Sequence, residues 1–221
     1  MKTKNLVLFW DWNGTIVDDA FVFVDVLNVL LKKNNLQKIT LDFYRENFCF
    51  PVVDFYKKLG LYQNASFFNS LNEDFISLYN QQKHSPKLKT NIVELINRLN
   101  NLNVKQYVVS AQNNKTLLGL VSFYGLEGSF VGVFGVDNNL ASGKKNVAAY
   151  LKNKHCVNSE ILVVGDTVLD FEVSNHLGAR CVLVDWGHCN LNRLSSCGVP
   201  VFSSVSGLEN FFIKDLGLTS L

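Results

Sequence analysis

The sequence lacks the charge and cysteine patterns that mark several classes of binding protein. Its 221 residues carry 21 Lys and Arg against 19 Asp and Glu, and no basic block stands out. This balance gives no support for a nucleic-acid partner or for any partner bound by bulk electrostatics. The five cysteines are scattered, odd in number and free of Cys-x-x-Cys pairs. We therefore expect reduced thiols, and neither a disulfide framework nor a zinc site.

Long apolar segments are also absent from the sequence. No uncharged apolar run is long enough to cross a bilayer, and the run at residues 6–10 is shorter than that of a signal peptide. We therefore expect a cytoplasmic protein without a membrane partner, acting as a monomer or a homodimer. Hydrophobic residues nevertheless make up 48% of the chain, which is enough for a sizeable core. The length suits one large domain, or a core domain with a smaller insertion.

The most informative stretch lies at residues 6–17. A wholly apolar run, Leu6–Trp10, leads directly into Asp11, and residues 13–15 add an amide, a glycine and a hydroxyl before apolar residues resume. An apolar run of this length that ends in a turn predicts a buried strand of a parallel sheet. Open α/β sheets bind their ligands at the carboxyl ends of the strands. Asp11 is therefore placed where a nucleophile or a metal ligand would lie.

Further β-prone runs alternate with helical patterns along the rest of the chain. The runs expected to form strands are residues 104–109, 130–136, 160–164, 181–184 and 201–202. Between them, apolar residues recur at helical spacing over residues 92–99, 117–121, 147–151 and 171–177. Strands that alternate with helices of this length predict an α/β protein with a Rossmann-like, doubly wound parallel sheet.

Residues 18–84 depart from this alternation. Their apolar positions keep helical spacing, aromatic residues are frequent, and no alternating strand pattern with hairpin signals is present. Asp18 and Asp19 favour a helix start, and Lys32 and Lys33 suit the end of that helix because both ends then match the helix dipole. We therefore predict an inserted α-helical domain at residues 18–84 and an α/β core domain formed by residues 1–17 and 85–221.

Polar side chains follow four of the predicted strands. Because the carboxyl ends of parallel strands share one edge of a sheet, we expect these residues to meet there: Asp11, Asn13, Thr15, Ser110, Lys144, Asp166 and Asp170. Carboxylates, a hydroxyl and an ammonium can together hold a phosphoryl group with a hard cation, and oxygen ligands favour Mg²⁺. Each residue alone also fits a turn, a helix cap or a solvated helix start, and Lys145 leaves the choice of lysine open. The prediction therefore rests on the combination.

The order of these residues resembles the haloacid-dehalogenase-like hydrolase superfamily. Its first motif, Asp-x-Asp-x-Thr, is matched by residues 11–15, and its second, a Ser or Thr that ends a strand, by Ser110. Lys144 resembles the third-motif lysine, and residues 165–170 match the fourth motif, Gly-Asp-x-x-x-Asp. The resemblance covers essentially the whole chain. An insertion between the first two motifs is similar to the helical cap of the phosphoglycolate-phosphatase-like branch.

The resemblance implies a magnesium-dependent phosphatase that acts on a small phosphorylated metabolite, with phosphoglycolate as the family default. Asp11 would attack phosphorus and form an aspartyl-phosphate that water then cleaves. The implied catalytic residues are Asp11, Asn13, Thr15, Ser110 and Lys144, of which the last two hold the phosphoryl group. The implied magnesium ligands are Asp11, the backbone carbonyl of Asn13, Asp166 and, in support, Asp170. The cap would close over the substrate and exclude water.

Asn13 departs from the family pattern, in which a second Asp protonates the leaving oxygen and then activates water. An amide forms hydrogen bonds but transfers no proton at neutral pH, and general acid–base catalysis is typically worth about 10²–10⁴ in rate. The change affects alkyl phosphates most, and aryl or acyl phosphates least. Two alternatives stay open: a catalytically weak phosphate-binding protein, and a phosphonate hydrolase with Lys57 or Lys58 as a Schiff-base lysine. His188 is expected in a surface loop near the site edge.

Overall fold

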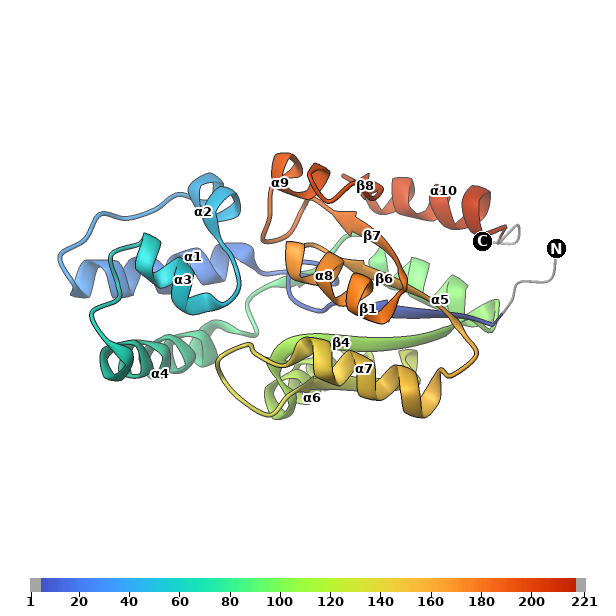
Figure 1. The fold of residues 1–221 in the computed structure, drawn as a ribbon, viewed down its shortest axis with the longest axis horizontal. Helices are drawn as coiled ribbons and strands as arrows, with labels where there is room; N and C mark the ends of the chain where they lie inside the picture. The colour runs from blue at the N-terminus through green and yellow to red at the C-terminus, as the bar shows by residue number, and fades with distance from the viewer. Residues whose placement is uncertain (1–4, 218–221) are drawn as a thin grey trace.

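The computed structural model describes residues 5–217, and its centre is a six-stranded sheet (Figure 1). The strand order is β5-β4-β1-β6-β7-β8, and every neighbouring pair is parallel. The strands are β1 (Leu6–Trp10), β4 (Lys105–Asn113), β5 (Gly132–Val136), β6 (Glu160–Gly165), β7 (Arg180–Val184) and β8 (Val201–Phe202). The chain winds outward from β1 in both directions, which confirms the predicted doubly wound α/β fold.

Helices cover both faces of the sheet, and the alternation of residues in β1 decides which side chains meet them. Leu8 and Trp10 pack on the face covered by α5 (Ile92–Asn101), α6 (Asn114–Phe123) and α10 (Val205–Leu216). Val7 and Phe9 pack on the opposite face, which is covered by α7 (Lys144–His155), α8 (Val168–Leu177) and α9 (Leu191–Ser195). Each fully buried apolar side chain of this size contributes about 1.5–3 kcal/mol. The end of β1 is thus held from both sides.

Four helices separate the first strand from the rest of the sheet. They are α1 (Ala20–Lys33), α2 (Leu41–Asn47), α3 (Val52–Lys58) and α4 (Ala65–Gln82), and they lie together at the left of Figure 1. Their aromatic and aliphatic side chains form a hydrophobic cluster of their own. The chain leaves and re-enters the core through an antiparallel ribbon of β2 (Val17–Asp18) and β3 (Lys87–Leu88). This arrangement supports our proposal that residues 18–84 form a separate cap domain.

The structure differs from the expected element boundaries at β4. Ser110, expected at the end of a strand, lies within β4, which continues to Asn113. The pairing of β4 with β5 is irregular between Val109 and Asn113, and the Asn113 side chain then caps α6 by accepting from the backbone N–H groups of Lys115 and Thr116. The irregularity ends the regular ladder near Ser110 although the strand runs on. Within residues 5–217, no helix is both long and apolar enough to span a membrane.

Candidate active site

Asp11 follows β1 directly, and its backbone N–H donates to the carbonyl of Val164 on the neighbouring strand at 2.8 Å. Its carboxylate is buried, with 8% of the residue exposed. The ammonium of Lys144 donates to Asp11 Oδ1 at 2.6 Å. Burial raises the pKa of the Asp11 carboxyl to about 6, although the ion pair with Lys144 opposes this. A fixed, buried carboxylate therefore stands at the end of the central strand.

Lys144 is the first residue of α7, and its side chain is buried between two carboxylates. Its ammonium also donates to Asp170 Oδ1, at 2.5 Å. Burial lowers the pKa of Lys144, but the charges of Asp11 and Asp170 outweigh burial and raise it, so that the ammonium stays charged. Lys145 instead pairs with Glu172 on the surface. The structure therefore brings Lys144, and not Lys145, to Asp11.

Asp170 holds the loop after β6 as well as Lys144. Its Oδ2 accepts from the backbone N–H and the hydroxyl of Thr167, at 3.0 and 2.7 Å, and from the backbone N–H of Asp166 at 3.2 Å. Thr167 and Asp170 form a capping box at the start of α8. Both carboxylate oxygens of Asp170 are thus engaged, one by the loop and one by Lys144.

Asp166 is fully buried beside the loop that follows Asp11. Its Oδ1 accepts from the hydroxyl of Thr15 at 3.1 Å, and its Oδ2 accepts from the backbone N–H of His188 at 2.6 Å. A Cβ atom at Gly14 or at Gly187 would lie 2.2 or 2.1 Å from Asp166 Oδ2. Only glycine therefore lets both loops approach this carboxylate so closely.

Asp11, Asp166 and Asp170 form a buried acidic cluster that fits a divalent cation. One carboxylate oxygen from each lies within 4.8 Å of the others. Lys144 supplies one positive charge against three carboxylates. Burial raises the pKa of Asp166, and the neighbouring Asp11 and Asp170 charges raise it further while His188 opposes this. Oxygen ligands with excess negative charge are the donor set that a hard cation such as Mg²⁺ prefers.

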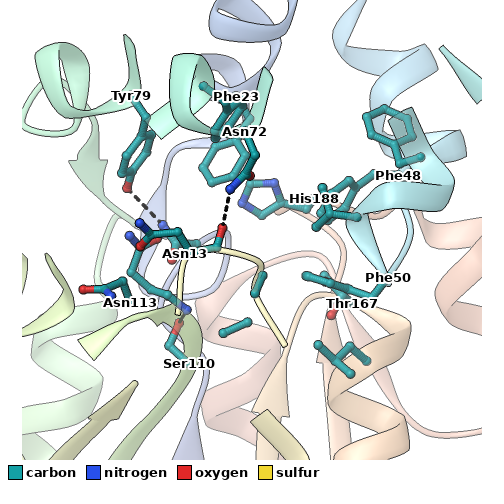
Figure 2. Close-up of a pocket in the computed structure, with 18 of the residues that line it drawn as sticks. Asn13, Phe23, Phe48, Phe50, Asn72, Tyr79, Ser110, Asn113, Thr167 and His188 are labelled. Atoms are coloured by element: carbon teal, nitrogen blue, oxygen red, sulfur yellow. Dashed lines mark hydrogen bonds between the residues drawn. The ribbon is translucent and has the colours of Figure 1, made fainter. Parts of the chain in front are cut away.

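The amide of Asn13 is bound by a carboxylate that the sequence did not assign to the site. Asn13 Nδ2 donates to Asp19 Oδ2 at 2.5 Å. It also donates to the hydroxyl of Tyr79 at 3.3 Å (Figure 2). The backbone N–H of Gly14 donates to Asp19 Oδ1 at 2.9 Å. Asp19 is the N-terminal flanking residue of α1, but its side chain makes no capping bond there. Helix α1 begins directly after Asp19, as expected, but the Asp19 carboxylate fixes the loop after Asp11 and does not cap the helix.

His188 is buried in the site, so the expected surface position is wrong. Its Nε2 lies 3.1 Å from Asp19 Oδ1, and its Nδ1 lies 2.8 Å from the hydroxyl of Tyr44 in the cap. Burial lowers the pKa of His188, but the bond to Asp19 and the nearby carboxylates outweigh burial and raise it. Arg45 of α2 donates to the backbone carbonyls of Trp186 and Gly187 at 2.8 and 2.7 Å. Sequence spacing did not predict the burial of His188, because residues of the cap, far away in the sequence, surround it.

A cavity of about 110 Å³ lies between the cap and the carboxyl ends of the strands. Asp11, Asn13, Ser110 and Lys144 line it from the core, and cap residues line it from above. Figure 2 shows Phe23, Phe48 and Tyr79 on the cap side, and Ser110 on the sheet side. The Ser110 oxygen accepts from the backbone N–H of Gln112 at 3.1 Å. The residues predicted to meet at one edge are therefore brought together, with Thr15, Asp166 and Asp170 outside the cavity lining but bonded to the site.

Comparisons with known proteins agree with this fold. A sequence profile of haloacid dehalogenase-like hydrolases matches residues 8–184. A predicted phosphatase from Clostridium acetobutylicum superposes with a TM-score of 0.81 at 16% identity, covering 96% of this chain and 99% of its own. A haloacid dehalogenase-like family hydrolase from Streptococcus pneumoniae gives 0.80 at 16% identity, covering 96% and 100%. A predicted phosphoglycolate phosphatase from Haemophilus somnus gives 0.75 at 17% identity, covering 96% and 99%.

None of the curated proteins compared with the chain by sequence matches it. The solved structures are under 25% identical, so they bear on the fold alone. The profile covers 177 of the 221 residues, from residue 8 to residue 184, and spans all four strand-end motifs. The predicted family and the prediction of a hydrolytic enzyme are thereby confirmed. The chain belongs to the haloacid dehalogenase-like hydrolase family.

Proposed function

We propose that the protein is a magnesium-dependent phosphatase that hydrolyses a small phosphorylated metabolite through an aspartyl-phosphate on Asp11. The observation that carries this proposal is the buried ion-paired set of Asp11, Lys144 and Asp170, with Asp166 beside it; Asp11 and Lys144 line the cavity. A buried carboxylate held by a charged ammonium is positioned for nucleophilic attack, and its surroundings exclude bulk water.

In the first step, a carboxylate oxygen of Asp11 attacks the substrate phosphorus, and the bond from phosphorus to the leaving oxygen breaks. Lys144 and the Ser110 hydroxyl, which both line the cavity, hold the phosphoryl oxygens as charge develops on them. In the second step, water attacks the phosphorus of the aspartyl-phosphate, which releases inorganic phosphate and restores the Asp11 carboxylate.

The acidic cluster supplies the ligands for the cation that this chemistry uses. Asp11, Asp166 and the backbone carbonyl of Asn13 would hold Mg²⁺, with Asp170 in support through Lys144 and the loop at Thr167. The bound cation would neutralise phosphoryl charge and orient the group for in-line attack. Thr15 and the His188 backbone N–H keep Asp166 in place for this purpose.

Asn13 limits the first step because its amide donates a hydrogen bond without transferring a proton. Asp19 and Tyr79 accept from the amide nitrogen and use both of its hydrogens, so Asn13 leaves a departing oxygen at the cavity unprotonated. This favours substrates whose leaving group departs readily as an anion. The fold is typical of the family, but the proposed reaction requires a leaving group that needs no protonation.

The two alternatives find different support. A phosphate-binding protein without turnover is favoured by the missing acid at Asn13. A Schiff-base phosphonate hydrolase gains none, because neither Lys57 nor Lys58 is among the described residues that line the cavity. Lys57 pairs with Asp54, and Lys58 donates to the Asn47 carbonyl, both on the exposed surface. The cytoplasmic location and the monomeric or homodimeric state stay predictions from the sequence.

Turnover of 4-nitrophenyl phosphate with Mg²⁺ tests the proposal. We expect Asp11→Asn to lower kcat by at least about 10³-fold, as loss of a nucleophile does. Asp42→Asn is the matched control, because Asp42 is exposed on the cap. Chelation should abolish turnover, and added Mg²⁺ should restore it. Phosphate binding measured by calorimetry without any turnover would favour the binding protein, and turnover that survives Asp11→Asn would remove the nucleophile assignment.

A further inference from the structure

The cap side of the cavity is almost entirely apolar and aromatic. Its wall includes Phe23, Phe48, Phe50, Phe55, Phe75 and Ile76. Among the described residues that line the cavity, Lys144 is the one lysine and no arginine is present. Lys144 is already shared by Asp11 and Asp170, and the ring nitrogens of His188 face Asp19 and Tyr44. Among the described lining residues, no cationic side chain therefore remains for a charged group on the leaving part of a substrate.

This lining selects against a second charge on the substrate. A carboxylate or a second phosphate that lies against the cap, beyond the reacting phosphoryl group, would contact phenylalanine side chains and have no cationic side chain as a partner among the residues described there. Burying an ionised group without a partner is strongly unfavourable, even after the relaxation that real proteins allow. Phosphoglycolate carries such a carboxylate. The cavity wall therefore argues for an uncharged leaving group.

The aromatic wall begins at the residue that replaces the general acid. The Tyr79 hydroxyl accepts from Asn13 Nδ2, and the Phe23 ring lies 5.4 Å from the Tyr79 ring and 4.7 Å from the His188 ring, centroid to centroid. The leaving group would thus enter an aromatic environment directly from the reacting phosphorus. The cavity volume of about 110 Å³ is of the order of the roughly 150 Å³ apolar cavity that accommodates benzene.

The amide of Asn13 also favours an aryl leaving group, because it provides no proton for the leaving oxygen. Without a proton donor, the leaving oxygen departs as an anion. A phenol has a pKa of about 10, whereas an alcohol resembles water, with a pKa of about 15.7. A phenolate therefore leaves without help far more readily than an alkoxide. The missing acid and the apolar wall are independent observations that favour an aryl group.

We infer that the substrate is a phosphate monoester of an uncharged phenol, an inference that rests on the proposed phosphatase function. Asp11 attacks phosphorus, and the bond between phosphorus and the phenolic oxygen breaks with its electron pair on the phenolate, which then takes a proton from water. A second water supplies the oxygen that converts the aspartyl-phosphate to inorganic phosphate, and one of its protons neutralises the hydroxide left by the first water. The products are one phenol and one phosphate, with Asp11 regenerated.

Four substrates separate the selection against a charged leaving group from the selection against an alkoxide leaving group. Phenyl phosphate is the reference, and 4-carboxyphenyl phosphate adds a charge while its phenolate leaves at least as readily. Benzyl phosphate keeps the ring but leaves as an alkoxide, and 2-phosphoglycolate has both disadvantages. We expect kcat/KM for 4-carboxyphenyl phosphate to be at least about 100-fold below that for phenyl phosphate. For benzyl phosphate we expect a similar KM and a kcat lower by about 10²-fold or more.

A cation placed on the apolar wall should reverse the charge selection. Ile76 lines the cavity from α4 and is only partly buried, and it lies outside the buried core clusters of the cap. Ile76→Lys should raise kcat/KM for 4-carboxyphenyl phosphate relative to phenyl phosphate by about tenfold or more, which is one new ion pair of about 1.4 kcal/mol. Ser77→Lys adds the same charge at the next, exposed position and should leave this ratio unchanged.

The outcomes distinguish this inference from the function on which it rests. Turnover that depends on Asp11 and prefers phenyl phosphate, with the ratio shifted by Ile76→Lys alone, supports both. Turnover that depends on Asp11 but is equal or greater for 4-carboxyphenyl phosphate or 2-phosphoglycolate overturns the inference and leaves the phosphatase. Absence of Asp11-dependent turnover with all four substrates overturns the phosphatase, and the inference with it.

Discussion

Replacing Asn13 by the aspartate of the family pattern should destabilise this protein. The Asn13 amide donates to Asp19 Oδ2 at 2.5 Å, and Asp19 is 1% exposed. In Asn13→Asp, a second carboxylate would face Asp19 in place of the donor. Two unit charges about 4 Å apart repel by about 4 kcal/mol at an effective dielectric constant of about 20. His188 Nε2 faces the other Asp19 oxygen and offsets part of this, so we expect a loss of about 3 kcal/mol at pH 8.

The loss should depend on pH, and its sign follows from proton binding. Burial beside the Asp19 carboxylate raises the pKa of the introduced carboxyl above its unfolded value of about 3.9. The folded variant therefore keeps a proton on this group at pH values where the unfolded chain has lost it. The folded variant then binds more protons than the unfolded chain between these two pKa values, and its free energy of unfolding falls as pH rises. Relative to the unaltered protein, the variant should be least destabilised near pH 5 and most destabilised near pH 8.

Thermal unfolding at pH 5, 6.5 and 8 measures the effect. For a chain of this length, 1 kcal/mol corresponds to about 2–4 °C in Tm, so the difference at pH 8 should be near 10 °C. Gly14 follows Asn13, and Asn-Gly pairs deamidate, so the intact mass of the unaltered protein must be checked. A Tm difference that is independent of pH, or a variant as stable as the unaltered protein at pH 8, would refute the charge argument.

The double substitution Asn13→Asp with Asp19→Asn exchanges the amide and the carboxylate. A donor and an acceptor then face each other again, so Tm at pH 8 should recover to within about 3 °C of the unaltered protein. The exchange also places an ionisable carboxyl group at the cavity, where it can carry a proton to the leaving oxygen in the proposed reaction. We expect kcat for benzyl phosphate to rise by about tenfold or more, and kcat for phenyl phosphate to change less. Equal changes for both substrates would contradict the role given to Asn13.

Three further predictions concern the charged site. Lys144→Met leaves two buried carboxylates without their cation and should cost about 3–5 kcal/mol in urea unfolding, whereas Lys145→Met, on the surface, should change stability by no more than about 0.5 kcal/mol. Gly187→Ala places a Cβ atom 2.1 Å from Asp166 Oδ2 and should weaken Mg²⁺ binding measured by calorimetry, while Gly128→Ala, with open space around it, should not. Saturating Mg²⁺ should raise Tm by about 5–10 °C, and Asp166→Asn should abolish this rise; an equal rise in that variant would place the cation elsewhere.

The sequence predicted the sheet and the convergence of the site because both follow from chain topology. The apolar run before Asp11 and the runs at residues 160–164 and 181–184 form buried parallel strands, and parallel strands end at one edge. Residues as distant as Asp11 and Lys144 therefore meet without any local signal. The sequence also predicted a helix start at Lys144 and Lys145 after Gly143, and α7 does begin at Lys144, although the choice between the two lysines needed the structure.

The environment of Asn13 was not predictable in this way, because it depends on side-chain direction and on the cap. The Asp18–Asp19 pair indicated a helix start, but a sequence pattern does not reveal that the Asp19 carboxylate turns toward Asn13 instead of capping α1. His188 reaches Asp19 across 169 positions of sequence, and Tyr79 and Tyr44 come from separate cap helices. Tertiary packing alone brings these groups together.

The Asn13–Asp19 pair and the apolar cavity wall both favour the same kind of leaving group in the proposed reaction. With a carboxylic acid at position 13, Asp19 would be a like charge in contact with it, so the amide is the stable partner of a buried Asp19. In the proposed reaction, that amide would remove the proton donor and restrict the enzyme to leaving groups that are stable as anions. Aromatic side chains around Tyr79 and Phe23 would then provide the surface that the inferred aryl leaving group contacts. The departure from the family pattern at Asn13 is thus tied to Asp19 on one side and to substrate choice on the other.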